Sequence, residues 1–266
     1  MHKLAREIRF SVNPFLEGCV EGFNSYASKP CGEGLALYFN LWIELAGEVD
    51  GDTGFVVNVT DIDKAVRSFV VPIFDEKIKE YYGKGEHVGL SVLCGILRET
   101  WSVLKDKFGT VTLSKMVLGL NPFRKITIKS EDCKVFYFSE KFEFAAMHTL
   151  WNDKFSDEEN FKVFGKCANP AGHGHNYVVE VTVKRNSGNE SAGWIGGFEK
   201  VVEDEFMGMV DHKNLNADVA EFGKKNPTVE NIASFAWGRL NGKFGQGELT
   251  SVTVWETDRT YCTYSG

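Results

Sequence analysis

The sequence predicts a protein of the α+β class that contains two copies of one strand-strand-helix-helix-strand-strand module. In each half, hydrophobic residues alternate with period two at both ends and follow helical spacing between them. Trp101 and Lys107-Phe108-Gly109 lie 136 residues before Trp237 and Lys243-Phe244-Gly245. Two unrelated halves of similar length are the alternative, and the shared order together with these matched residues favours duplication.

The N-terminal half, residues 1–130, supplies the first copy. Strands are expected near residues 8–12 and 35–45, helices near 61–82 and 89–108, and strands near 111–120 and 123–128. The half is about 130 residues long, a length that suits one domain.

The C-terminal half, residues 131–266, repeats the order. Residues 134–148 and 175–185 alternate like strands, and a turn at 186–189 follows. Helices are expected over 198–210 and from Thr228, a suitable N-cap after Pro227, and a hairpin of 249–256 and 259–264 ends the half. The polar stretch 151–172 is long for a hairpin turn and is interpreted as a candidate functional loop.

Composition excludes several classes of protein. The chain has 266 residues, of which 43% are hydrophobic and 25% charged, unlike a disordered chain, a collagen or a coiled coil. The net charge of -7 argues against an extended nucleic-acid-binding surface, which needs a basic excess. No stretch approaches a membrane span or a signal-peptide core, so a cytoplasmic protein is expected. The six cysteines form no Cys-x-x-Cys pair and are expected to be reduced thiols.

The two halves differ in charge and chemistry. Residues 1–130 carry 16 Lys/Arg and 16 Asp/Glu, whereas residues 131–266 carry 14 and 21, so the whole acidic excess lies in the second half. Four of the six histidines lie there too: His148, His173, His175 and His212. A site is therefore expected in the second copy.

Three of these histidines have the composition of a catalytic zinc site. His173 and His175 are two residues apart at the start of a strand, so their imidazoles point to the same face. His148, at the end of the preceding strand, reaches that face if the two strands pair. Three imidazoles without a fourth protein ligand leave one zinc position for water or substrate. A turn with two solvated histidines is the alternative.

Other residues could supply proton transfer and ligand binding. Cys167 lies six residues before His173, where a nearby cation would lower its pKa and let it act as a base; a buried structural cysteine is the alternative. In the adjacent pair Asp211 and His212 a carboxylate could orient an imidazole, although such pairs are often merely solvated. Glu256 ends an apolar strand, and its two oxygens suit paired N–H donors such as those of a guanine or pterin.

Together these residues resemble the 6-pyruvoyltetrahydropterin synthase family, and the long loop is more similar to the animal-type enzyme than to shorter bacterial relatives. The similarity covers 144–266 almost without a break. It rests on these motifs: Phe144-Ala145-Ala146-Met147-His148, Phe155-Ser156-Asp157-Glu158-Glu159-Asn160, Phe164-Gly165-Lys166-Cys167-Ala168-Asn169-Pro170-Ala171-Gly172-His173-Gly174-His175-Asn176-Tyr177, Asp211-His212-Lys213-Asn214-Leu215, Pro227-Thr228-Val229-Glu230-Asn231 and Glu256-Thr257-Asp258.

The resemblance implies a T-fold (tunnelling fold): a four-stranded antiparallel sheet with two helices on one face, which assembles edge to edge into a barrel. It implies that His148, His173 and His175 bind Zn²⁺ and that Cys167 is the base. It further implies that Asp211 and His212 support Cys167, and that Glu256, helped by Thr228 and Glu230, anchors the pterin. The implied reaction converts 7,8-dihydroneopterin triphosphate to 6-pyruvoyltetrahydropterin with loss of triphosphate.

Two departures from the family are visible. Gly197 stands where the family has Asp or Asn opening the first helix, so that helix is expected to start differently. The first copy lacks the site: Phe10-Ser11-Val12-Asn13-Pro14 replaces the segment with the first histidine, Gly32-Glu33-Gly34-Leu35 replaces His-Gly-His, Phe74-Asp75-Glu76 contains no histidine, and Leu120 replaces Glu256.

The leading hypothesis is a zinc-dependent pterin synthase whose first repeat is structural and which forms a homo-oligomer, a trimer of tandem repeats. One alternative is a 6-carboxytetrahydropterin synthase for 7-deazaguanine synthesis on the same site. Another is a non-catalytic pterin-binding protein. Retention of Cys167, Asp211 and His212 argues against the last, because binding alone needs mainly Glu256.

Overall fold

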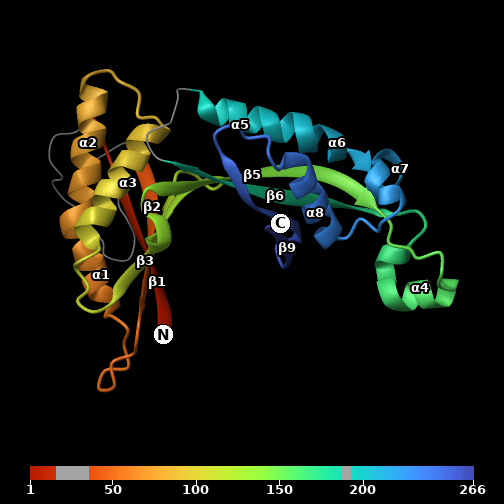
Figure 1. Ribbon diagram of the computed structural model, residues 1–266, viewed down its shortest axis with the longest axis horizontal. Coiled ribbons are helices and arrows are strands. Elements are labelled where there is room, and N and C mark those ends of the chain that lie inside the picture. The colour runs from red at the N-terminus through yellow and green to blue at the C-terminus, as the bar shows by residue number, and fades with distance from the viewer. Residues whose placement is uncertain (16–35, 187–192) are drawn as a thin grey trace. The chain divides into compact units, whose positions relative to one another are not determined.

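The computed structural model describes residues 1–15, 36–186 and 193–266, and it divides into two compact units. One unit is Met1–Phe138 with Asn186–Ala192, and the other is Ser139–Arg185 with Gly193–Gly266. Helices and antiparallel sheet occur in both, which confirms the predicted α+β class (Figure 1). None of the helices in the described ranges has the length and hydropathy needed to cross a membrane.

The first unit is an antiparallel sheet with the strand order β1-β2-β3-β4 and helices on one face (Figure 1). Its elements are β1 (His2–Val12), β2 (Leu37–Gly47), α1 (Val59–Ala65), α2 (Val71–Gly83), α3 (Leu90–Leu104), β3 (Thr112–Gly119) and β4 (Arg124–Lys129). The core is mainly apolar, and Leu41, Ile43, Phe74 and Leu97 are fully buried in it.

The second unit repeats this plan with the strand order β5-β6-β8-β9, and β7 adds a short parallel pair to β5. Its elements are β5 (Val135–His148), α4 (Asp157–Phe164), β6 (His173–Asn186), α5 (Trp194–Val202), α6 (Gly208–Val210), β7 (Lys213–Asn214), α7 (Leu215–Asp218), α8 (Val229–Leu240), β8 (Glu248–Thr257) and β9 (Thr260–Tyr264).

Local sequence explains the elements that carry the site. Tyr177, Val179 and Val181 alternate along β6 and are fully buried, because successive side chains of a strand point to opposite faces. Helix α8 begins after Thr228, whose side chain accepts a hydrogen bond from Asn231 N, as expected for an N-cap. The buried face of α8 then packs against β8 and β9, which places its N-terminus at one end of the sheet.

The two units share irregularities as well as element order. A turn of π-helix interrupts the helical stretch that follows the second long strand of each unit, at Val66–Val70 after β2 and at Glu203–Met207 after β6. Each also has a bulge where the pairing skips one residue, Ser114 in β3 and Thr250 in β8. The bulged hydroxyl donates to a carbonyl oxygen of the neighbouring strand in both cases, over 3.0 Å in the first unit and 3.1 Å in the second.

Several predicted boundaries are wrong. The stretch 151–172 is not an irregular loop: it contains α4, which lies beyond the end of β5 (Figure 1). Ser156 and Glu159 form a reciprocal capping box there, which offsets the unfavourable start of a short helix. The unbroken helix expected over 61–82 is instead α1, a π-turn and α2.

One strand and one helix also begin at residues other than the predicted ones. Strand β1 begins at His2 rather than near Ile8, because its polar first half still pairs with β2 from Gly47 onward. Helix α5 begins at Trp194, so Gly197 lies inside it, and its N-cap Gly193 has a φ of 85° and no capping side chain. The segment Gly32-Glu33-Gly34-Leu35 and the turn at 187–189 lie outside the described residues.

Candidate active site

The three predicted metal ligands converge at the ends of two neighbouring strands. His148 ends β5 on the same buried face as Phe144 and Ala146, and His173 and His175 begin β6. Their ring centroids are 4.5 to 5.2 Å apart, and one potential ligand atom from each lies within 4.8 Å of the others. The sequence prediction that these imidazoles meet is therefore confirmed in geometry.

The neighbours of His148 determine which of its nitrogens is available. The side chain is fully buried, and Nδ1 lies 2.8 Å from the carbonyl oxygen of Pro227. Because a carbonyl oxygen only accepts, Nδ1 carries the proton and Nε2 keeps its lone pair. Burial is the main cause that lowers the pKa of His148, so the ring stays neutral near pH 7, as a metal ligand must.

The donor set fits a zinc ion. Neutral imidazoles are common zinc ligands, and Zn–N bonds of about 2.0–2.1 Å in tetrahedral geometry place two ligand nitrogens about 3.3 Å apart. The Nε2 atoms of His148 and His173 are 3.1 Å apart. In addition, His175 Nε2 and His173 Nδ1 are buried polar atoms without a hydrogen-bond partner, and the first lies where a ligand would satisfy it.

Glu256 lies at the same cluster. Its Oε1 is 3.6 Å from His175 Nε2 and 3.7 Å from His148 Nε2. The side chain of Glu256 is 22% exposed, so solvent or a ligand can reach it while Oε1 lies near the histidines. Thr228 acts as the N-cap of α8, and Glu230 is exposed on the first turn of that helix, where its charge adds to the effect of burial in raising the pKa of Cys262.

Cys167 lies in the turn of 3₁₀-helix Gly165–Ala168 that follows α4. Its carbonyl oxygen accepts a hydrogen bond from Leu150 N over 2.8 Å, which ties this turn to the residues just after His148. Burial and, second, the charge of Glu256 raise the pKa of the Cys167 thiol. In the chain without a bound cation the thiol is therefore held in its protonated form.

Asp211 and His212 form a pair beside β5. Asp211 Oδ1 accepts from Ala145 N over 3.0 Å, and Oδ2 lies 2.9 Å from His212 Nδ1. The hydrogen bond from Ala145 N is the main cause that lowers the pKa of Asp211. His212 has a φ of 55°, in the left-handed region, and its side chain is 83% exposed. A solvated imidazole in a strained backbone conformation is typical of a functional position.

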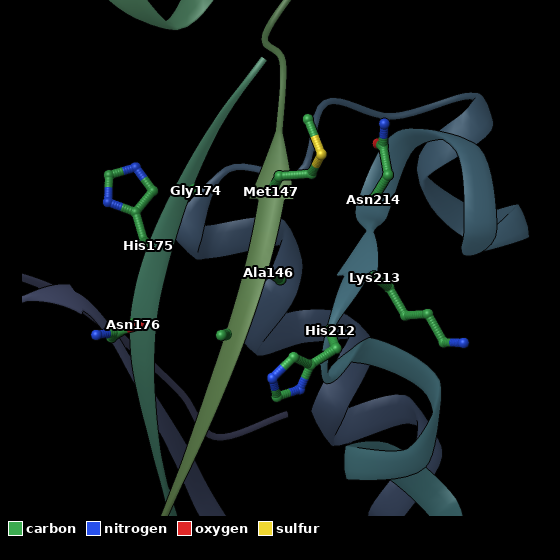
Figure 2. A pocket seen from close by; sticks show the side chains of 9 residues that line it. Ala146, Met147, Gly174, His175, Asn176, His212, Lys213 and Asn214 are labelled. Atoms are coloured by element: carbon green, nitrogen blue, oxygen red, sulfur yellow. The ribbon is translucent and has the colours of Figure 1, made fainter. Parts of the chain in front are cut away.

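A pocket of about 440 Å³ lies next to this pair. Figure 2 shows His212 reaching toward the strands from beside β5, whereas His175 projects from the opposite side of the strand pair. The residues that line the pocket are Ala145, Ala146, Met147, Gly174, His175, Asn176, His212, Lys213 and Asn214. Across the described parts of the chain, no hydrogen bond or ion pair links Asp211 or His212 to Cys167.

The structure adds residues that sequence reasoning missed. The side-chain amide of Asn216 makes two hydrogen bonds to the backbone of Thr149: its Oδ1 accepts from Thr149 N and its Nδ2 donates to the Thr149 carbonyl oxygen. Asn226 Oδ1 accepts a hydrogen bond from Trp151 N. The ring centroid of Tyr177 lies 5.5 Å from that of His175. The hydroxyl of Tyr177 is buried and has no hydrogen-bond partner in the described part of the chain. The only sequence signal for Asn226 was its place one residue before Pro227.

Comparison with known proteins gives a consistent result. The sequence profile described as 6-pyruvoyl tetrahydropterin synthase matches residues 137–266. The human 6-pyruvoyl tetrahydrobiopterin synthase is 41% identical over 131 residues, which are 48% of this chain and 90% of that protein. The Drosophila melanogaster protein of the same name is 37% identical over 137 residues, 50% of this chain and 80% of that protein.

A solved structure of the Caenorhabditis elegans 6-pyruvoyl tetrahydropterin synthase is 32% identical and matches with a TM-score of 0.45, covering 50% of this chain and 96% of that one. The sequence relatives match the half of the chain that carries the histidine cluster, Cys167 and Glu256. Through this second half, the chain belongs to the 6-pyruvoyl tetrahydropterin synthase family.

Proposed function

We propose that the second unit is a zinc-dependent lyase that converts 7,8-dihydroneopterin triphosphate to 6-pyruvoyltetrahydropterin with release of triphosphate. The observation that carries the proposal is the convergence of His148, His173 and His175 beside Glu256, with Cys167 close enough for the Glu256 charge to raise its pKa. This arrangement combines a metal site, a carboxylate and a thiol at the end of one sheet.

The proposed roles follow from the environments of the side chains. A zinc ion held by the three histidines would act as a Lewis acid toward oxygens of the substrate side chain. Glu256 would accept hydrogen bonds from paired N–H groups of the pterin ring, while Thr228 and Glu230 support it from the start of α8. Cys167 would take a proton from carbon once a nearby cation offsets the burial that now raises its pKa.

Asp211 and His212 would complete the proton transfer. Asp211 holds the Nδ1 side of the ring, which leaves Nε2 free to exchange a proton. Because no bond joins His212 to Cys167 within the described chain, the proton would pass through the substrate or across a contact between chains. A homo-oligomer, a trimer of tandem repeats, would supply such contacts, and a stable monomer in sedimentation would contradict this part of the proposal.

We also propose that the chain consists of two repeats, residues 1–130 and 131–266, which correspond broadly to the two units, and that only the second repeat is catalytic. Support comes from the bulge residues Ser114 and Thr250, which lie 136 residues apart and donate the same hydrogen bond. In the first unit Phe10, Phe39 and Phe74 pack with ring centroids 5.1 to 5.5 Å apart. These apolar side chains fill that core without a metal-binding group.

The test is to purify the protein with its metal and to incubate it with 7,8-dihydroneopterin triphosphate. Triphosphate release together with 6-pyruvoyltetrahydropterin in the product is the expected result. Formation of 6-carboxytetrahydropterin instead would identify the alternative reaction on the same site. Tight binding of the pterin without turnover would identify a binding protein and overturn the proposal. Turnover that survives Cys167→Ala would show that another group is the base.

A further inference from the structure

The segment before α8 approaches the end of β5 at two points. Asn226 Oδ1 accepts a hydrogen bond from Trp151 N over 2.9 Å, and the next residue, Pro227, lies 2.8 Å through its carbonyl oxygen from His148 Nδ1. Trp151 is three residues after His148, so the two contacts and the intervening backbone form a closed ring. Each contact therefore limits the movement that could break the other.

The peptide groups in this ring are fixed from the other side as well. The carbonyl oxygen of Asn226 accepts from Asn231 Nδ2 and from Thr228 N, each over 2.8 Å. The ring of Pro227 restricts its own φ to about -65°. Pro227 is buried, and Asn226 is half-buried at the edge of the site. The direction of the Pro227 carbonyl therefore depends on how Asn226 is held.

We propose that Asn226 is a positioning residue for metal binding: through the Pro227 carbonyl it keeps the proton of His148 on Nδ1 and directs Nε2 to the metal. The inference deepens the proposed function and rests on it only in taking His148 as a metal ligand. No part of the side chain of Asn226 touches the histidine cluster by any bond in the described chain, so its effect is exerted through the backbone.

The physical basis is the loss of metal affinity that follows when the Pro227 carbonyl oxygen no longer accepts the hydrogen bond from His148 Nδ1. If the 226–227 segment moves away, the buried Nδ1–H of His148 loses the Pro227 carbonyl oxygen, which is its only hydrogen-bond partner among the described residues. The imidazole can then carry its proton on Nε2, which occupies the lone pair that would bind the metal, or it can rotate, which turns that lone pair away from the metal position. Substituting a group that orients a metal-bound histidine typically lowers metal affinity about 10–100-fold.

The side chain of Asn226 offers a sharp pair of variants. Asn226→Ala removes the acceptor for Trp151 N, whereas Asn226→Asp keeps an oxygen in the same place. Asn121→Ala is the matched control, because Asn121 Oδ1 likewise accepts from the backbone N–H groups of Phe123 and Arg124, but in the first unit. Asn231→Ala removes the hydrogen bond from Asn231 Nδ2 to the Asn226 carbonyl oxygen, and it replaces Asn226→Ala in the test if that variant folds poorly.

The experiment measures zinc affinity by competition with a chromophoric chelator and the absorption spectrum of the cobalt-substituted full-length chain. Asn226→Ala and Asn231→Ala are expected to weaken zinc binding about tenfold or more and to alter the cobalt spectrum. Asn226→Asp and Asn121→Ala are expected to bind zinc at least as tightly as the unmodified chain. Equal affinity and identical spectra for Asn226→Ala, or equal weakening by Asn226→Asp, would overturn the inference.

A different result tests the proposed function. If the unmodified chain does not bind zinc, or binds it equally well after His173→Ala, the metal site itself is wrong. If zinc binding by the unmodified chain is tight and product formation is absent, the proposed reaction is wrong while the role of Asn226 is still measured by the affinity ratio. A missing metal site would thus overturn both proposals, whereas missing product formation would overturn the proposed reaction alone and equal zinc affinities would overturn the role of Asn226 alone.

Discussion

The Nε2 atoms of His148 and His173 lie 3.1 Å apart on neighbouring strands. At this distance the two nitrogens share at most one proton, or they share a cation. The acceptor at His148 Nδ1 leaves the lone pair of His148 Nε2 directed at the cluster, where it can accept a hydrogen bond from His173 or bind a cation. The two nitrogens thus lie at nearly the spacing that a tetrahedral metal ion requires.

Metal content is expected to be about one zinc per chain, since among the described residues the one group of three histidines that could hold a metal lies in the second unit. His173→Ala should reduce bound zinc to near zero, whereas His87→Ala, in the first unit, should not change it. Elemental analysis after gel filtration measures both. Two zinc ions per chain, or full retention after His173→Ala, would contradict the assignment and the proposal that the first unit binds no metal.

The backbone conformation of His212 predicts that two substitutions of this residue differ in stability although both abolish activity. A side chain in the left-handed region costs about 1–2 kcal/mol that glycine does not incur. His212→Gly should therefore be more stable than His212→Ala, by about 1 kcal/mol after allowing for the greater freedom of glycine in the unfolded chain. Urea denaturation compares the variants, and both should lose turnover. Equal stability of the two would show that the φ of 55° is not kept in solution.

The thiol of Cys167 is expected to react slowly in the metal-free protein. Burial and the charge of Glu256 raise its pKa, so alkylation by iodoacetamide should increase with pH through a midpoint above that of an ordinary cysteine. Glu256→Gln removes a negative charge and should shift the midpoint downward. Peptide mass spectrometry follows Cys167 separately from the exposed Cys133. A midpoint below that of Cys133 would mean that another group activates the thiol.

The unpaired hydroxyl of Tyr177 predicts that its removal stabilises the metal-free chain. A buried hydroxyl without a partner costs about 1–3 kcal/mol, and Tyr177→Phe keeps the ring that stacks on Phe144. The free energy of unfolding should rise by about 1 kcal/mol. Tyr261→Phe, at a side chain that is 62% exposed, is the control and should change little. A loss of stability in Tyr177→Phe would show that the hydroxyl is hydrogen-bonded in solution.

Much of the fold was predictable because it follows from local periodicity. Alternation in β5 and β6 located the strands that carry His148, His173 and His175, and Thr228 marked the start of α8. The failures lie where short-range signals compete. Helix α4 was missed although Ser156 and Glu159 form a capping box, and the residue spacing of the two helical stretches did not predict their π-turns.

The sequence by itself determined which residues are candidates for the site and the half of the chain in which they lie, since motif spacing and strand period act over a few residues. Tertiary structure decided their relations. Pro227, 79 residues from His148, selects the ring nitrogen left for a metal, and Glu256 comes within 4 Å of two histidines. His212 faces solvent instead of bonding to Cys167. Such relations depend on which strands pair and where helices pack, and no local pattern encodes those distances.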